Sequence, residues 1–93
     1  MTHRLHPPPT GFCGPVKRSV TIAGHATSIS LEPVFWAALE AAATAHALPL
    51  SAVVGEIDAG RLGALTPPNL ASAIRSWLLA RAMMGAFDAN YSQ

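Results

Sequence analysis

The sequence predicts a mainly helical domain that carries a short β-ribbon. Apolar and polar residues alternate with period two within residues 18–31, and the spacing becomes helical from Pro33 onward. Two further helical stretches follow, each preceded by a proline-containing break. The 93 residues suffice for one small domain, and 51% of them are hydrophobic while 12% are charged. This apolar composition favours a surface that is buried against another subunit.

Residues 1–15 are expected to form a disordered or polyproline-like arm, because Pro7, Pro8, Pro9 and Pro15 lie there. The spacing of the histidines and of Cys13 matches no compact zinc pattern, so neither a metal site nor a cofactor is expected. A single cysteine excludes an intrachain disulfide and fits a reducing cytoplasm.

The segment 18–31 leaves two interpretations open. Two runs of β-forming residues, 18–22 and 27–31, surround a glycine-containing break and could pair as a hairpin. Alternatively, only 27–31 forms a strand, and 18–22 is an extended lead-in that follows the basic pair Lys17 and Arg18. In either case the alternation places Ile29 and Leu31 toward the helices.

The first helix is expected to begin at Glu32 and Pro33, since proline is well tolerated in a first turn. Phe35 and Leu39 begin its apolar stripe, and Trp36 lies one step off that stripe. Trp36 could therefore pack across a dimer or lie exposed as an anchor for a partner.

Two more helices are expected after Pro49. Ser51 is the candidate N-cap of the second helix, which should stop at Gly60 and Gly63. Thr66 or Asn69 should cap the third helix, which has Trp77 in its core stripe. We expect this helix to fade by Gly85, so that the ordered domain covers 16–84 and residues 85–93 form a frayed tail.

An enzyme is not expected, because the sequence contains no paired carboxylates, no glycine-rich phosphate loop and no nucleophile with a plausible base. No run of about 18 apolar residues is present, so a membrane is not an expected partner. The net charge of +1 is low for a protein that binds nucleic acid, because neutralised phosphates supply much of the affinity.

Three segments in order, 17–39, 50–58 and 69–75, resemble a bacterial family of small ribbon-helix-helix proteins. The helix start Glu-Pro-Val-Phe-Trp and the late segment Asn-Leu-Ala-Ser-Ala-Ile-Arg carry much of the likeness, which extends over roughly residues 17–82. The resemblance implies an obligate, intertwined homodimer. Each chain would give one strand to an antiparallel ribbon, with four helices beneath it.

The resemblance also implies a DNA site. The side chains of the ribbon that would face base edges are Ala26, Ser28 and Ser30. The groups that it implies as phosphate contacts are Ser51 and the amide of Ala52. Lys17 and Arg18 are expected to contact phosphates as well, because they lie just before the ribbon. The expected dimer core comprises Ile29, Leu31, Phe35, Leu39, Val54 and Ile57.

Two functional hypotheses remain. The first is a cytoplasmic homodimer that binds double-stranded DNA as a transcriptional regulator or antitoxin-like repressor. The second is a ribbon-helix-helix dimer that serves as a protein-interaction or assembly module without binding DNA. The position of Lys17 and Arg18 discriminates between them. If 18–22 pairs with 27–31, a dimer has four strands that span roughly 14 Å at about 4.8 Å per gap, more than a major groove of about 12 Å.

Overall fold

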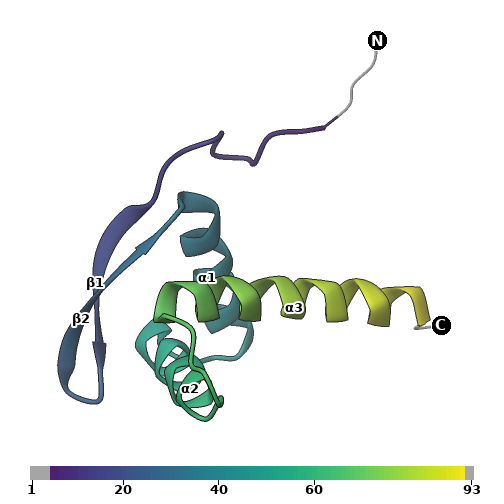
Figure 1. Ribbon diagram of the computed structural model, residues 1–93. Helices are drawn as coiled ribbons and strands as arrows, with labels where there is room; N and C mark the ends of the chain where they lie inside the picture. The colour runs from purple at the N-terminus through teal and green to yellow at the C-terminus, as the bar shows by residue number, and fades with distance from the viewer. Residues whose placement is uncertain (1–4, 92–93) are drawn as a thin grey trace.

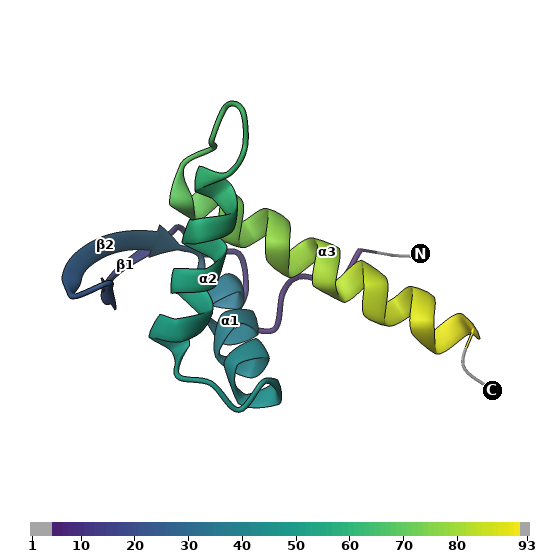
Figure 2. The same ribbon diagram turned by 90° about the horizontal axis from the view of Figure 1, so that it is seen from below.

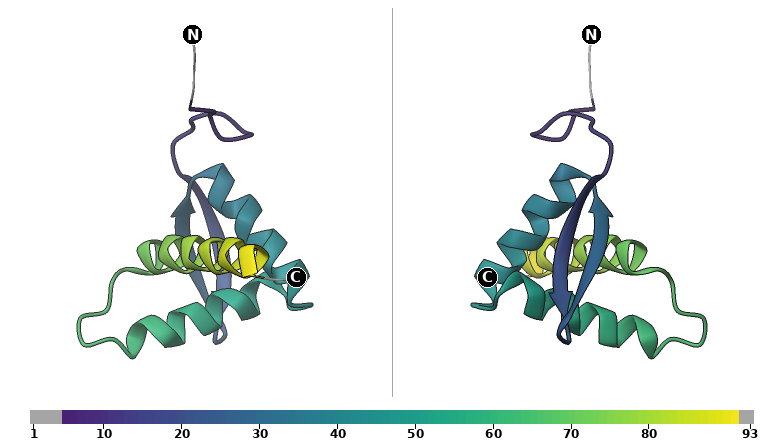
Figure 3. Two further views of the ribbon diagram at one scale, coloured as in Figure 1. Left: turned by 90° about the vertical axis from the view of Figure 1, so that its right-hand side faces the viewer. Right: turned by 90° about the vertical axis from the view of Figure 1, so that its left-hand side faces the viewer.

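The computed structural model describes the backbone of residues 5–91 and the side chains of residues 5–85. Two strands, β1 (Val16–Ile22) and β2 (His25–Leu31), precede three helices, α1 (Pro33–Ala45), α2 (Leu50–Leu62) and α3 (Leu70–Tyr91). The strands form one layer and the helices lie behind it (Figures 1, 2 and 3). This confirms the predicted mainly helical fold with a short ribbon and an extra C-terminal helix.

The two strands pair with each other as an antiparallel hairpin. The register runs from Val16 opposite Leu31 to Ile22 opposite His25. The two linking residues, Ala23 and Gly24, have φ angles of 50° and 83°. Positive φ at both central positions defines a type I′ turn, whose twist matches that of the strands it joins. The hairpin interpretation is therefore confirmed, and the extended lead-in is wrong.

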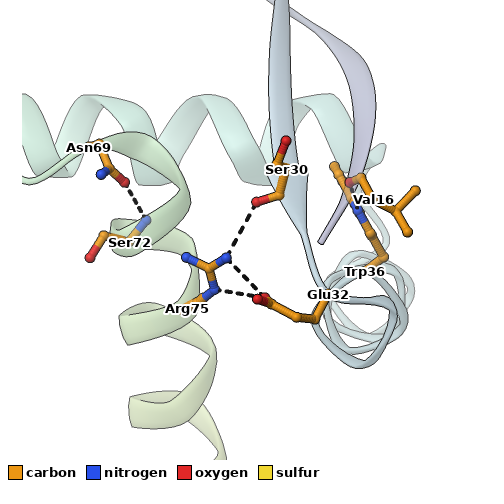
Figure 4. A network of polar contacts seen from close by, with 7 residues as sticks. All are labelled: Val16, Ser30, Glu32, Trp36, Asn69, Ser72 and Arg75. Carbon is orange, nitrogen blue, oxygen red and sulfur yellow. Dashed lines mark hydrogen bonds and ion pairs between the residues drawn. The ribbon is translucent and has the colours of Figure 1, made fainter. Parts of the chain in front are cut away.

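Contacts with α1 hold β1 in place. The Trp36 indole Nε1 donates a hydrogen bond to the Val16 carbonyl oxygen at 2.9 Å (Figure 4). The Arg18 guanidinium lies 4.4 Å from the centre of the Trp36 ring, and its Nη1 is 3.1 Å from Glu40 Oε2. Trp36 and Glu40 are one helical turn apart, so one face of α1 binds the strand at two points. These contacts explain why this segment is a strand.

The hydrophobic core lies between the hairpin and the helices and receives residues from every element. Its buried members are Val20, Ile29, Leu31, Trp36, Leu39, Ala42, Ala43, Val53, Val54, Ile57, Ile74 and Leu78. All but Phe35 of the predicted dimer-core residues are thus already buried within one chain, and Phe35 packs partly buried against them. A second chain is not required to cover them, and dimerisation stays a prediction.

The two tryptophans differ from expectation. Trp36 is 4% exposed and belongs to the core, although it was predicted to lie off the apolar stripe. Trp77 is only partly buried and packs at the edge of the core. The reason is the position of β1, which covers the Trp36 side of α1 and accepts the indole hydrogen bond.

The first helix ends in a Schellman motif that the sequence did not reveal. The Leu48 amide donates to the Ala43 carbonyl at 2.9 Å, and the Ala47 amide donates to the Thr44 carbonyl at 3.0 Å. Ala47 has a φ of 55°, the left-handed conformation that this motif requires. Glycine is the usual residue at such a position because it has no Cβ.

Of the expected helix ends, the start at Pro33, the Asn69 cap and the stop at Gly63 are confirmed, and others are wrong. The Asn69 Oδ1 accepts a hydrogen bond from the Ser72 amide at 2.8 Å and caps α3. Pro49 precedes α2 and no side chain caps it, so Ser51 is the second helical residue and not the N-cap. Gly60 lies inside α2, and Gly63 ends it. Instead of fading by Gly85, α3 continues to Tyr91.

The segment before β1 contains no helix or strand in residues 5–15, apart from a turn closed by the Gly11 amide and the Pro8 carbonyl at 2.8 Å. Part of the predicted arm, residues 1–4, lies outside the described residues, and disorder of the arm stays a prediction. Among residues 5–91 no single helix is long and apolar enough to cross a membrane. Helices α1 and α2 pass that test only as a pair, and the pair is bent by 101°.

Candidate nucleic-acid interface

One face of the hairpin is polar and points away from the helices. Because facing residues of an antiparallel pair share a side of the sheet, the register assigns the same outward side to three residues from each strand. We call this surface the polar face. Its members are Lys17, Ser19 and Thr21 of β1 and Ala26, Ser28 and Ser30 of β2. The predicted ribbon residues therefore do lie together on one surface, in line with the inward burial of Ile29 and Leu31.

The polar face carries mostly hydroxyl groups and little charge. Lys17 lies opposite Ser30, and Ser19 lies opposite Ser28. The face is exposed apart from Ser30, which is half-buried. Its hydroxyl groups can donate to or accept from base edges and phosphates, but they cannot make the bidentate contacts that discriminate strongly between bases. Small side chains also allow a close approach to a flat partner.

Lys17 and Arg18 are neighbours in the sequence but lie on opposite faces of the sheet. Lys17 belongs to the polar face, whereas Arg18 shares the inner side with Ile29 and contacts Trp36 and Glu40. The structure thus separates two residues that were predicted to contact phosphates together. Both also lie in the strand that flanks β2, and such an outer strand widens the ribbon and favours a role other than DNA binding.

The start of α2 does not belong to the polar face. Helix α2 passes behind the hairpin, with its first turn to one side of the strands (Figure 3). The Ala52 amide, predicted to hold a phosphate, already donates to the Pro49 carbonyl at 3.0 Å. Ser51 is exposed in the first turn and makes no capping bond. The structure therefore does not bring these two residues together with the serines of β2.

One edge of β2 faces away from β1. Next to a two-residue turn the first residue pair is hydrogen-bonded, and every second pair after it is too. The backbone groups of Ala26, Ser28 and Ser30 consequently point to the open edge. The Ser30 carbonyl accepts a long contact of 3.5 Å from Arg75 Nη2 there. Within residues 5–91 the sheet has two strands, so this edge is available for a further strand.

A polar junction that no sequence pattern predicted joins α3 to the end of β2 (Figure 4). Arg75 Nε donates to Glu32 Oε1 at 3.0 Å, and Nη2 lies 2.9 Å from the same oxygen. The backbone amide of Glu32 and the side chain of Arg75 both hydrogen-bond the carboxylate and together lower the pKa of Glu32. The two residues are 43 positions apart, so no local pattern could have paired them.

The charge available for binding phosphate is small. Arg18, Arg61 and Arg75 are each in an ion pair with a carboxylate. Lys17 and Arg81 form no ion pair among the residues that the structure describes, and only Lys17 lies on the polar face. The same part of the chain contains no group of three or more side chains that could hold a metal ion.

A comparison with protein families decides the classification. The model of the ribbon-helix-helix domain matches residues 15–82. The chain belongs to the ribbon-helix-helix domain family. The matched region includes β1 as well as β2. Ribbon-helix-helix domains typically form dimers and bind DNA. No curated protein and no solved structure matches this member of the family significantly.

Proposed function

We propose that this ribbon-helix-helix protein binds double-stranded DNA as a cytoplasmic homodimer, in the role of a transcriptional regulator or antitoxin-like repressor. The observation that carries the proposal is the polar face, on which both strands present mostly small polar side chains, while the opposite face of the hairpin carries the buried Val20, Ile29 and Leu31. Family membership supports the same function, because ribbon-helix-helix domains typically bind DNA as dimers.

The dimer forms through the open edge of β2 in this proposal. Two copies of β2, antiparallel and centred near Ser28, pair through the outward backbone groups of Ala26, Ser28 and Ser30. The resulting sheet has the strand order β1, β2, β2, β1. The 3.5 Å contact of Arg75 with the Ser30 carbonyl is at the limit of a hydrogen bond and is readily exchanged for a strand partner.

A sheet of four strands is too wide to enter a groove flat, so only its centre reads bases. The two β2 strands, about 4.8 Å apart, fit within a groove of about 12 Å. The flanking β1 strands then lie over the phosphate walls, where Lys17 makes the phosphate contact. Ser28 and Ser30 face the base edges and discriminate weakly, so we expect low sequence selectivity.

Salt dependence of binding tests the proposal. Two Lys17 side chains per dimer give a slope of log K against log salt of about −1.8, which weakens binding about 12-fold between about 50 and 200 mM salt. We would measure this by fluorescence anisotropy of a labelled duplex. Lys17→Ala should abolish most of the slope, whereas Arg18→Ala, the same loss of charge on the opposite face, should leave it unchanged. Equal effects of the two variants would contradict the proposed orientation.

A second candidate function is a protein-interaction or assembly module. The position of β1 as an outer strand and the engagement of Arg18 by Glu40 and Trp36 favour it, because both reduce the charge and openness of the ribbon. Absence of DNA binding at about 50 mM salt, from protein shown to be dimeric, would reject the regulator and leave this module as the function.

A further inference from the structure

The second half of α3 leaves the body of the domain. Among residues 70–85, whose side chains the structure describes, Leu78 is the last core residue of this helix, and after it Leu79, Met83 and Met84 are 61, 62 and 60% exposed. Figures 1 and 2 show the end of α3 extending past the other helices. At about 1.5 Å per residue, the segment 79–91 extends about 20 Å. Large apolar side chains that are exposed together indicate an interaction site, so Leu79, Met83 and Met84 call for a cover.

An apolar groove lies between α2 and the first half of α3. Its volume is about 530 Å³, and its floor includes Val53, Ile57 and Trp77. The far side of the groove is held by Arg61, which donates to Asp58 at 2.8 Å and to the Pro68 carbonyl at 3.1 Å. The groove is therefore a formed feature of the surface, bounded by a fixed loop.

The groove and the projecting end of α3 form one continuous surface. Ala73, Ser76 and Trp77 line the groove from α3. At about 100° per residue, Ala80, Met83 and Met84 follow on the same side of the helix. All six side chains point within about 60° of their common mean direction. The exposed methionines thus extend the wall of the groove beyond the domain.

We propose that a second copy of this chain covers this surface, through an antiparallel pair of α3 helices with a two-fold axis near Ala80. In this arrangement Met83 and Met84 of each copy fill the groove beside Trp77 of the other. One surface supplies both the groove and the apolar side chains that fill it, as a closed two-fold interface requires. The small side chain at position 80 lets the helices approach closely at the axis.

The positions of two charged side chains also support a second copy of the chain as the occupant of the groove. Glu56 lies at the groove rim and Arg81 on the projecting helix. Neither forms an ion pair among the described residues of its own chain. Two antiparallel copies bring the helix that carries Arg81 toward the rim that carries Glu56, so opposite charges face each other at the edge of the interface.

This interface is independent of the proposed function, because it uses α2 and α3 and leaves the β2 edge free. The two can be separated by working with Ser28→Pro, which removes an outward amide from the β2 edge and blocks strand pairing there. Any remaining dimer of the 9.7 kDa chain then reports on the α3 interface alone.

The test compares Ala80→Glu with Ala82→Glu in both the natural sequence and Ser28→Pro. Both replaced alanines are exposed, but position 82 lies on roughly the opposite side of α3. Sedimentation equilibrium should show a dimer for Ser28→Pro, a dissociation constant raised at least about tenfold by Ala80→Glu, and no change with Ala82→Glu. In the natural sequence, Ala80→Glu should lower the mean mass and Ala82→Glu should not.

Two outcomes of the mass measurements would overturn the inference. One is that Ala80→Glu, introduced into the natural sequence, leaves the mean mass in sedimentation equilibrium unchanged. The other is equal loss of mass with both glutamate variants, which would indicate damage to the helix itself. A fluorescent apolar probe gives a second readout. It should bind the groove of Ala80→Glu but not of Ala82→Glu, and strong binding to the natural sequence would show an open groove that no second copy fills.

Discussion

Arg75 on α3 and Glu32 at the start of α1 form an ion pair with 2.9 Å between Nη2 and Oε1. The same arginine lies 5.6 Å from the centre of the Phe35 ring. One side chain thereby connects the third helix to the junction between the hairpin and the first helix. Since α3 also supplies Ile74 and Leu78 to the core, the junction fixes how the C-terminal helix sits on the ribbon-helix-helix unit.

The Glu32 carboxylate should make the free energy of unfolding depend on pH in the acid range. Its pKa is lowered from 4.5, by the backbone hydrogen bond of Glu32 first and by Arg75 second. A lowered pKa in the folded state gives stability that is present above the unfolded value and is lost as the pH falls through the folded value. We expect Glu32→Gln to flatten the fall in the free energy of unfolding below about pH 4.5, measured by urea titration at several pH values. A parallel decline in the variant would show that other carboxylates dominate.

A substitution in the hairpin turn should stabilise the fold. Ala23 adopts a φ of 50°, which costs an alanine roughly 1–2 kcal/mol and costs asparagine less. Ala23→Asn should therefore raise the free energy of unfolding by about 0.5–1 kcal/mol and raise the Tm. Gly24→Ala, where φ is 83°, should lower stability instead. Thermal unfolding followed by circular dichroism would check both, and a lower Tm for Ala23→Asn would contradict the type I′ assignment.

Truncation of the ribbon core should be costly. Leu31 is fully buried, so Leu31→Ala should lower the free energy of unfolding by about 2–5 kcal/mol through lost burial and the cavity that remains. Leu48→Ala, at a side chain 38% exposed, should cost much less. Urea denaturation measures both. Similar losses for the two leucines would refute the register that points Leu31 inward.

Strand pairing between two chains can be tested at a matched pair of serines. Ser19 and Ser28 face each other in the hairpin, and their amides point to opposite edges of the sheet. Ser28→Pro should abolish the proposed β2–β2 dimer while the monomer keeps its fold, whereas Ser19→Pro should leave the dimer intact. DNA affinity should fall with Ser28→Pro, because the proposed DNA-binding unit is the dimer. If Ser19→Pro lowered the mean molecular mass and Ser28→Pro did not, the interface would lie on β1.

Local patterns predicted the elements of the fold well. The period-two alternation correctly assigned Ile29 and Leu31 inward and Ser28 outward, because burial of one face leaves a direct trace in a strand. The Glu32–Pro33 helix start and the Asn69 cap also followed from residue chemistry within a few positions. Family membership followed from the order of these same segments.

Long-range contacts decided what local patterns left open or missed. Whether 18–22 is a strand depended on Trp36 and Glu40 of α1, which no spacing within the strand could reveal. Ser51 looked like a cap by residue type, but α2 begins one position earlier, at Leu50. Gly85 did not end α3, because one glycine costs a helix only about 1 kcal/mol when its neighbours are good helix formers.

The candidate site was predicted only in part. The residues Ala26, Ser28 and Ser30 share a face because strand alternation is local. The separation of Lys17 from Arg18 follows from the same alternation once β1 is known to be a strand, and the engagement of the Ala52 amide follows from where α2 starts. Arg75 had no local signal that could link it to the β2 edge.

A core that one chain closes by itself separates folding from assembly. Since one chain already buries most of the residues that a second chain was expected to bury, we expect the monomer to fold before it pairs and to exchange partners. Occupancy of a DNA site by the dimer would then rise with the square of the monomer concentration while monomers predominate. A regulator built in this way responds steeply to its own abundance, and two related chains in one cell could form mixed dimers.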